Sequence, residues 1–324
     1  MVTDHATTDA DLPKPSFRGK HFMGIDIVGA APDVFATNTG MISQSQPTRG
    51  ILRAYIDQEI IPPRVRDITY EQIQEECAEI LQEWAADPKM ADQMVMRGTV
   101  TRMIVKILSG TTISYEDAQS TTAAYARRFG ELSILDRYLP FLTGVLGSRE
   151  AIRRDAYFVL KRYDLDNLLI DMTLFAAMFS LGTLFMRCVD DITRHGTDYE
   201  SLDARGRVAF IIESVRLFPT VTTTHRIVEE PETIVVAGKE LQLQPGDEVC
   251  YPLVAANRDP SAFHEPEKHR IDRPMEEVAK VLSWSKGPHV CPAKDMSVQV
   301  VRVMLDAVAE KQGLKGLHYG RTAF

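Results

Sequence analysis

The segment from Asp166 to Thr193 constrains the fold of this chain more than any other stretch. It carries a single glycine, Gly182, and no proline, so it contains no strong helix breaker. Its apolar residues fall on nearly every side of the expected helix, and a helix of that kind is buried rather than lying on a surface. The sequence therefore predicts a long helix through the middle of the protein, with the other elements packed around it.

Shorter patterns on both sides of this segment predict the fold class. Apolar residues recur at helical spacing in several stretches, namely 69–84, 94–108, 115–130 and 202–217. After Pro219 the texture changes to short strand-like runs separated by turn residues, at 221–228, 233–237 and 240–243. Residues 248–256 fit either a strand or the start of a helix. We expect a mainly α protein with a small β-sheet region, an α+β fold.

Composition excludes several function classes. The chain has 324 residues, a net charge of −8 and no long basic run, which argues against a nucleic-acid partner. Four widely spaced cysteines without a CxxC motif are typical of a reducing cytoplasm.

Residues 1–18 are polar and acidic, with neither a signal peptide nor a membrane anchor, and are expected to form a flexible tail. Residues 19–324 are expected to form a single domain.

Cys291 lies at the boundary between a loop and a helix. Gly287, Pro288 and Pro292 punctuate the loop, and helical apolar spacing begins at Met296. Backbone N–H groups and the positive end of the helix dipole favour a thiolate there, which is the form of cysteine that binds metal. The alternative is a buried and inert thiol.

The residues around Cys291 resemble the heme-binding loop of the cytochrome P450 family. Trp284, Gly287, His289, Cys291 and Ala293 occupy the family's positions in the segment WSKGPHVCPA. The resemblance implies heme b as the cofactor, with Cys291 as the axial thiolate ligand of the iron. It also implies a cytochrome P450-like fold that is shorter at both ends than in most members.

Two further segments are similar to that family. Glu213 and Arg216 match its E-x-x-R motif, although an isolated pair at this spacing is also a common helix ion pair. The third basic residue of this brace is expected to be Lys268 or Arg270. The string ANRDP at residues 256–260 is similar to a segment of bacterial members and stands in the right order before the cysteine.

The resemblance also implies ligands for the heme propionates. Arg49, Arg53, Arg226 and His289 match the basic positions, and Trp284 occupies the aromatic position of the heme loop. Buried carboxylates need such partners. For Arg49 and Arg53, which are four residues apart, a solvated helix face remains an alternative. No histidine or cysteine in this region has the spacing of a zinc site.

The central helix departs from the family where an acid and an alcohol normally deliver protons. The corresponding stretch reads AAMFS, so Phe179 replaces the acid, and either Ser180 or Thr183 supplies the hydroxyl. A phenyl ring cannot carry a proton, and positioned proton transfer typically contributes about 10²–10⁴-fold to a rate. We therefore treat Phe179, Ser180 and Thr183 as the candidate catalytic positions.

The resulting hypothesis is a cytoplasmic heme-thiolate enzyme acting on a small organic molecule. Three mechanisms remain open: monooxygenation with electrons from a ferredoxin and its reductase, direct use of peroxide, and isomerisation or dehydration without net oxidation. A non-catalytic heme sensor is a further alternative. The missing acid favours peroxide or no oxidant over dioxygen.

Overall fold

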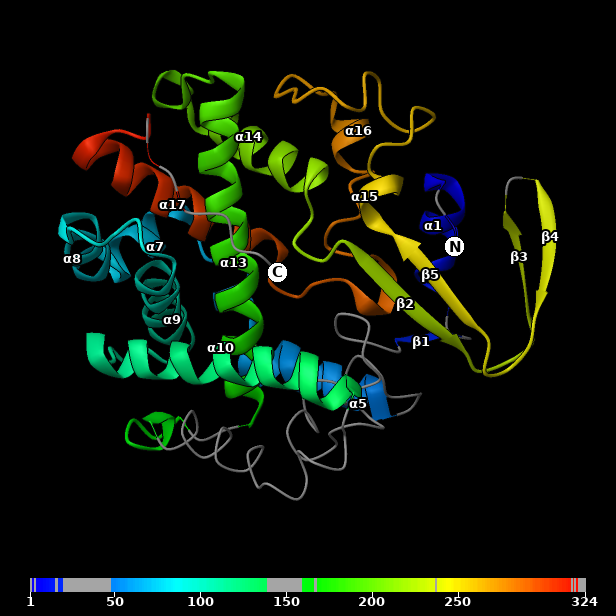
Figure 1. The fold of residues 1–324 in the computed structure, drawn as a ribbon, viewed down its shortest axis with the longest axis horizontal. Helices are drawn as coiled ribbons and strands as arrows, with labels where there is room; N and C mark the ends of the chain where they lie inside the picture. Colours follow the sequence, from blue (N-terminus) through cyan, green and yellow to red (C-terminus); the bar gives the residue numbers. More distant parts are fainter. Residues whose placement is uncertain are drawn as a thin grey trace.

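The computed structural model describes residues 2, 4–14, 17–19, 48–138, 159–165, 168–236, 238–315, 317 and 319. Figure 1 shows the arrangement of its helices and strands. In chain order these are α1 (His5–Asp11), β1 (Phe17–Gly19), α5 (Thr48–Tyr55), the π-helical turn η1 (Ile56–Ile60), α6 (Pro63–Arg66), α7 (Tyr70–Glu76), α8 (Ala78–Ala86), α9 (Gln93–Ser109), α10 (Tyr115–Tyr138), α13 (Leu168–His195), the 3-10 turn η2 (Tyr199–Ser201), α14 (Ala204–Leu217), β2 (Thr223–Val228), β3 (Glu232–Val236), β4 (Lys239–Leu243), β5 (Glu248–Pro252), α15 (Leu253–Ala256), α16 (Met275–Val278), the 3-10 turn η3 (Gly287–His289) and α17 (Lys294–Gln312).

Helix α13 passes through the middle of the molecule, as its apolar sequence predicted (Figure 1). It packs against α9, α14 and α17, and the main hydrophobic core forms along these contacts. Phe185 of α13 shows how the core is joined. Its ring meets Trp84 of α8 and Tyr319 edge to face, with centroids 5.4 and 5.5 Å apart. Among the described residues, no helix combines the length and the apolar character needed to cross a bilayer.

Local sequence signals set several helix ends. Thr69 and Gln72 form a capping box at the start of α7. Asp92 caps α9 by accepting from the N–H groups of Met94 and Val95, and Gly110 ends that helix in the left-handed conformation. These ends agree with the helical patterns read from the sequence, because capping depends on residues within one turn.

The strands form a small antiparallel region beside the helices. β1, β2 and β5 make a three-stranded sheet in the order β1-β2-β5, and β3 and β4 make a separate hairpin. In the sheet His225 lies opposite Cys250, and Arg226 lies opposite Val249. The ambiguous stretch at 248–256 is both predicted elements in succession, the strand β5 followed by the short helix α15. The mixture confirms the mainly α fold with a small sheet.

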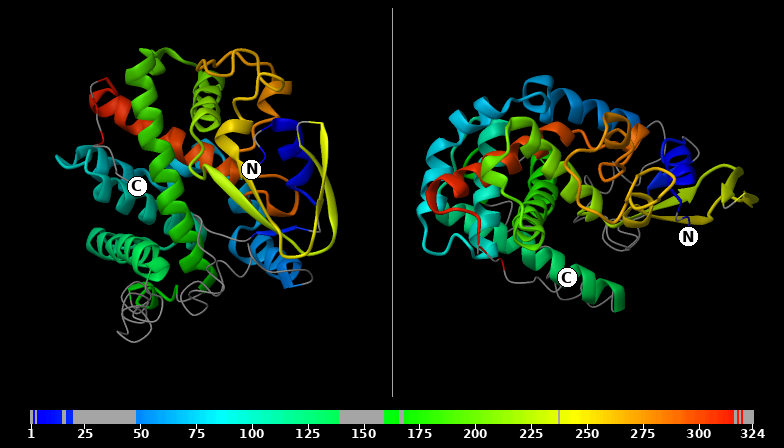
Figure 2. Two further views of the ribbon diagram at one scale, coloured as in Figure 1. Left: turned by 45° about the vertical axis from the view of Figure 1, so that its right-hand side comes forward. Right: turned by 90° about the horizontal axis from the view of Figure 1, so that it is seen from above.

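The described N-terminal residues include the helix α1, where the sequence predicted a flexible tail over residues 1–18. Asp4 caps α1 by accepting from the N–H of Thr7, and the helix lies beside β3 and α15 (Figure 2). Val2 and Leu12 are 2% and 0% exposed. Polar composition alone suggested a solvated segment. A few apolar anchors and long-range hydrogen bonds, such as the one from the His5 N–H to Asp259 at 2.8 Å, hold it in place.

Candidate functional site

The Cys291 loop is closed by its own backbone. The N–H of Cys291 donates to the carbonyl of Trp284 at 2.9 Å, and the N–H of Val290 donates to that of Gly287 at 3.0 Å. Gly287 has a φ of 64°, which favours glycine. The loop therefore presents the thiol just before the N-terminus of α17. Burial raises the pKa of the Cys291 thiol, against the opposing effects of the Ala293 N–H and the charge of Arg53.

Arg53 joins this loop from α5, far away in the sequence. Its Nη1 donates to the carbonyl oxygen of Val290 at 2.7 Å, and its Nε donates to Asp57 at 2.8 Å. The side chain is 21% exposed, so the alternative of a fully solvated helix face does not describe Arg53. The side chain of Arg49, one turn earlier, lies outside the described residues.

Arg226 reaches the same loop from the sheet. It is 2% exposed, and its Nη1 donates to Oγ1 of Thr224 at 2.5 Å. Its Nη2 lies 3.5 Å from Oγ of Ser285, next to Trp284 in the loop. His289 is half-buried in η3. The sequence prediction thus located two basic residues that the structure brings to the Cys291 loop, and it missed the polar partners Asp57 and Ser285.

Trp284 connects the loop to the helix that follows it. Its indole N–H donates to Oγ of Ser297 in α17 at 3.2 Å. The ammonium of Lys294 lies 5.4 Å from the centre of the ring. The indole is therefore held between loop and helix, and it packs at the edge of the main core.

On α13 the three candidate catalytic residues, Phe179, Ser180 and Thr183, have different surroundings. Thr183 is exposed and Ser180 half-buried, and their spacing of three residues puts both hydroxyls on one side of the helix. The ring of Phe179 lies under the guanidinium of Arg97 at 4.9 Å, so it packs toward α9. Gly182 lies against α9 too, because a Cβ there would be 3.1 Å from Cγ of Arg97.

The E-x-x-R motif forms a buried brace, but its third member differs from the prediction. Arg216 contacts both oxygens of Glu213 at 2.7 and 2.8 Å, and Arg273 contacts both at 2.9 Å through its Nε. The expectation of Lys268 or Arg270 was wrong. Arg270 contributes its backbone N–H to Glu213, and the Lys268 side chain pairs with Glu265 instead.

The charges of this brace are matched despite their burial. Burial by itself would raise the pKa of Glu213, but the hydrogen bond and charge of Arg216, with Arg270 and Arg273, lower it. Glu213 therefore stays ionised, and two guanidiniums hold it. The sequence places Arg273 in a segment before Pro274 that also contains Lys268 and Arg270. Sequence position alone does not indicate which of these side chains contacts Glu213.

The ANRDP segment explains how the brace reaches the loop. Arg216 donates to the backbone oxygen of Asn257 at 2.6 Å. The Asn257 side chain accepts from the N–H of Leu282 at 2.9 Å and donates to Ser283 at 2.9 Å. Ser283 in turn donates to the Val215 carbonyl at 2.8 Å. This chain of bonds ties α14 to the segment that enters the Cys291 loop.

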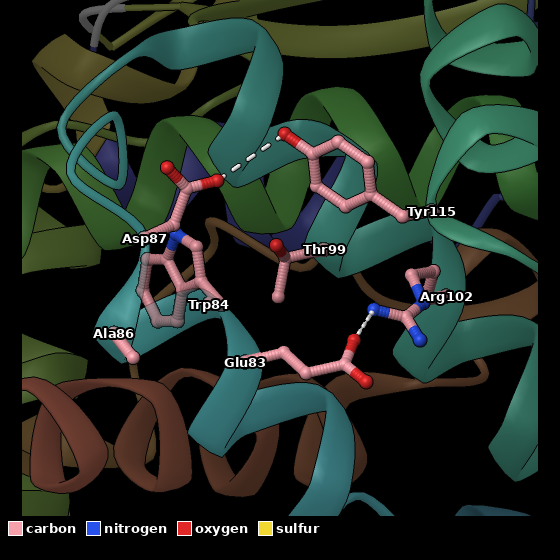
Figure 3. A pocket seen from close by; sticks show the side chains of 7 residues that line it. All are labelled: Glu83, Trp84, Ala86, Asp87, Thr99, Arg102 and Tyr115. Atoms are coloured by element: carbon pink, nitrogen blue, oxygen red, sulfur yellow. Dashed lines mark hydrogen bonds and ion pairs between the residues drawn. The ribbon is translucent and has the colours of Figure 1, made fainter.

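A separate hollow of about 310 Å³ lies between α8, α9 and the start of α10 (Figure 3). Arg102 and Glu83 form an ion pair on one side at 2.5 Å, and Tyr115 donates to Asp87 on the other at 3.3 Å. None of the residues from the Cys291 loop lines it. The hollow is therefore distinct from the candidate site.

Comparison with known proteins finds similarity to one family over about a third of the chain. The cytochrome P450 family profile matches residues 208–310. Linoleate 10R-lipoxygenase of Aspergillus fumigatus is 32% identical over 106 residues, which are 33% of this chain and 9% of that protein. Probable cytochrome P450 28d1 of Drosophila melanogaster is 26% identical over 117 residues, 33% of this chain and 23% of that protein. The chain thus spans a small part of the length of these relatives.

Solved structures show the same fold over nearly the whole chain. P450BioI, in complex with an acyl carrier protein ligated to hexadec-9Z-enoic acid, superposes with a TM-score of 0.66 at 17% identity, covering 95% of this chain and 84% of that one. The hydroxylase HmtN superposes with a TM-score of 0.66 at 19% identity, covering 95% and 81%. At this identity the likeness concerns the fold.

Proposed function

We propose that this chain is a heme-thiolate enzyme of the cytochrome P450 type, which oxidises or rearranges a small organic molecule and uses heme as its cofactor. One observation carries the proposal. Arg53 from α5 and Arg226 from β2 both reach the loop that presents Cys291. A cysteine thiolate can serve as the axial ligand of heme iron, and basic side chains beside it can pair with the two heme propionates.

The residues present fit that cofactor. Cys291 would hold the iron, and Arg226, Arg53, Arg49 and His289 would hold the propionates, with Trp284 beside them. Burial keeps the free Cys291 thiol protonated, and a metal cation is what ionises such a thiol on binding. When bound, the heme supplies the redox and oxygen-transfer chemistry that the side chains lack.

In the proposed heme site, the side chains of α13 would deliver the protons that the reaction needs. Residues 172–189 of α13 contain no aspartate or glutamate, so the acid of the family motif is missing from the stretch around Phe179. Ser180 and Thr183 can pass a proton between hydrogen-bonded partners but hold no proton reservoir near neutral pH. Phe179 packs against Arg97 and contributes no polar atom. This arrangement supports an oxidant that brings its own protons, or a rearrangement.

The names of similar proteins suggest the substrate class. One relative is named for linoleate, and one structural neighbour is titled with hexadec-9Z-enoic acid on its carrier protein. We extend the proposal to long-chain unsaturated fatty acids, either with hydrogen peroxide or as their hydroperoxides. A conventional monooxygenase fed by NAD(P)H through a ferredoxin and its reductase is the competing function.

The test compares three regimes with the heme-loaded protein. Linoleate is supplied with hydrogen peroxide, or with dioxygen, NADPH, ferredoxin and reductase, and linoleate hydroperoxide is supplied alone. Products are quantified by mass spectrometry against Cys291→Ala, which lacks the ligand. Turnover with peroxide or with the hydroperoxide alone supports the proposal. Turnover only with NADPH and dioxygen assigns the monooxygenase function, and heme binding without turnover in any regime contradicts the enzyme assignment for this substrate class.

A further inference from the structure

A cysteine, a histidine and a glutamate meet on the sheet, outside the proposed heme site. Sγ of Cys250 lies 3.6 Å from Nε2 of His225. Nδ1 of the same ring lies 2.7 Å from Oε1 of Glu248. His225 and Cys250 are opposite each other on β2 and β5, and Glu248 precedes Cys250 by two residues.

Strand alternation puts the three side chains on one face. Glu248 of β5 is exposed and Cys250 is half-buried, whereas Val249 and Tyr251, which alternate with them along the strand, are buried. His225 is half-buried, and the next residue along β2, Arg226, is buried on the other face beside the Cys291 loop. The group therefore stands at the outer surface of the sheet, on the side away from the residues proposed to hold heme.

The carboxylate determines which ring nitrogen faces the thiol. Since Glu248 can only accept when it is ionised, Nδ1 of a neutral His225 carries the proton and donates it. The lone pair of Nε2 then points at Sγ of Cys250. Burial raises the pKa of the Cys250 thiol, so at neutral pH the sulfur depends on a base to lose its proton. A nucleophile, a base and a group that orients the base form the arrangement that activates a cysteine.

Two simpler explanations account for less. An ion pair between His225 and Glu248 explains the contact at Nδ1, but it does not explain a thiol at Nε2. A metal site needs more ligands, and across the described part of the chain no cluster of three or more His, Cys, Asp or Glu side chains could hold an ion.

We propose that Cys250 is a nucleophilic thiol that adds to uncharged α,β-unsaturated carbonyl compounds, with His225 as its base and Glu248 orienting the ring. The sulfur forms a bond to the β-carbon while the π electron pair of the double bond moves toward the carbonyl. The proton taken by His225 returns to the α-carbon, which leaves a thioether and needs no oxidant or leaving group. The carboxylate of Glu248 disfavours anionic reagents. Acyl transfer would also need donors for an oxyanion, which these three side chains lack.

The test measures the rate at which N-ethylmaleimide modifies Cys250 in the full-length, heme-loaded protein. Peptide mass spectrometry separates the four cysteines, and Cys77 and Cys188 are buried internal controls. At pH 7 we expect the wild type to react about tenfold faster than His225→Gln, with Glu248→Gln between them. The difference in rate should narrow as the pH rises above the pKa of the thiol, because the sulfur then ionises without a base. The exposed His264→Gln is the matched control and should react like the wild type.

Equal rates for the wild type and both variants across the pH range would overturn the proposal. So would a Cys250 that reacts more slowly at pH 7 than it does in the protein's own denatured chain, a comparison that depends on no variant. Circular dichroism of each variant shows whether the fold is retained. If His225→Gln does not fold, Glu248→Gln still tests the proposal, because it keeps the size of a side chain that is 33% exposed.

Discussion

At the residue scale, Cys291 depends on side chains that are distant in sequence. Its loop is contacted by Arg53 from α5 and by Arg226 from β2, which lie on opposite sides of α13 in the chain order. The thiol itself is buried enough to be protonated in the free chain. In the proposed site, a metal cation bound to Cys291 would ionise this thiol.

The first prediction concerns this cysteine. Replacing Cys291 with Ala removes the proposed thiolate, so the reduced protein under carbon monoxide should lose the red-shifted Soret band that thiolate ligation gives. Cys250→Ala is the matched control and should keep the band, because Cys250 lies on the outer face of the sheet. A Cys291→Ala protein with an unchanged band would refute the ligand assignment.

At the element scale, buried charges join α14 to the segment that precedes α16. Glu213 receives Arg216 from its own helix and Arg273 from the segment before α16. Arg273 also donates to Glu277 and to backbone oxygens of residues 264, 265 and 268. Removing one partner of such a group leaves a buried charge without its counter-ion, which costs more than the loss of a surface pair.

The second prediction separates the two arginines that could have served as the third member. Arg273→Met should lower the free energy of unfolding by about 3–5 kcal/mol, because it leaves Glu213 with one guanidinium. Arg270→Met should leave the free energy of unfolding nearly unchanged, since that side chain is 27% exposed and only its backbone N–H reaches Glu213. Urea denaturation of the two variants measures the difference. Equal destabilisation would show that Arg273 has no special part in the brace.

A third prediction follows from His269, which lies between α13 and α14. It stacks on His195 at 5.0 Å, and its Nε2 lies 3.1 Å from Oγ of Ser214. Burial lowers its pKa from 6.5 to about 4, with the neighbouring His195, Arg216 and Arg187 acting in the same direction and Glu213 against it. Between these two values the unfolded chain binds a proton that the folded chain does not.

The free energy of unfolding should therefore lose nothing to His269 above about pH 6.5. It should fall toward pH 4 by up to about 3 kcal/mol because of His269 alone. His269→Asn should lose the pH dependence that His269 causes. The difference in free energy of unfolding between the wild type and His269→Asn should therefore shrink as the pH falls. The buried Asp191 has a raised pKa and acts with the opposite sign in both proteins. Urea midpoints measured from pH 7.5 to 4.5 give the comparison, and parallel curves would rule out the role of His269.

At the scale of the whole molecule, the N-terminal helix supports the Cys291 loop. A Cβ at Gly287 would lie 2.4 Å from Cβ and 2.6 Å from Cα of Pro13, which follows α1. The neighbouring Lys286 pairs with Asp9 at 2.6 Å. The first residues of the chain and the loop before α17 are therefore in direct contact.

The fourth prediction tests this contact with two glycines of similar backbone. Gly287→Ala should destabilise the protein and weaken heme retention, because it adds a clash with Pro13 to the strain of a positive φ. Gly238→Ala has a φ of 75° but meets nothing within 4 Å, so it should show the strain alone. Melting temperature and heme absorbance per protein are the measurements. If the two variants behave alike, the N-terminal helix does not support the loop.

The sequence by itself determined the features that rest on short-range chemistry. Apolar spacing identified α13 as the central helix, capping residues agreed with the starts and ends of helices, and the loop around Cys291 was recognisable from consecutive residues. The E-x-x-R pair was visible for the same reason, since residues three apart on a helix are neighbours. These interactions close within a turn or two, so the order of residues is enough to predict them.

The tertiary structure alone decided which distant residues meet. It selected Arg273 rather than Lys268 or Arg270, packed the ring of Phe179 toward α9, and docked α1 beside the Cys291 loop. It also placed His225 opposite Cys250 through the register of β2 and β5. Each of these contacts depends on how elements cross and pair after long stretches of chain, and several side chains of the same type compete for each place. Packing and burial choose between them, and neither is encoded in the spacing of neighbouring residues.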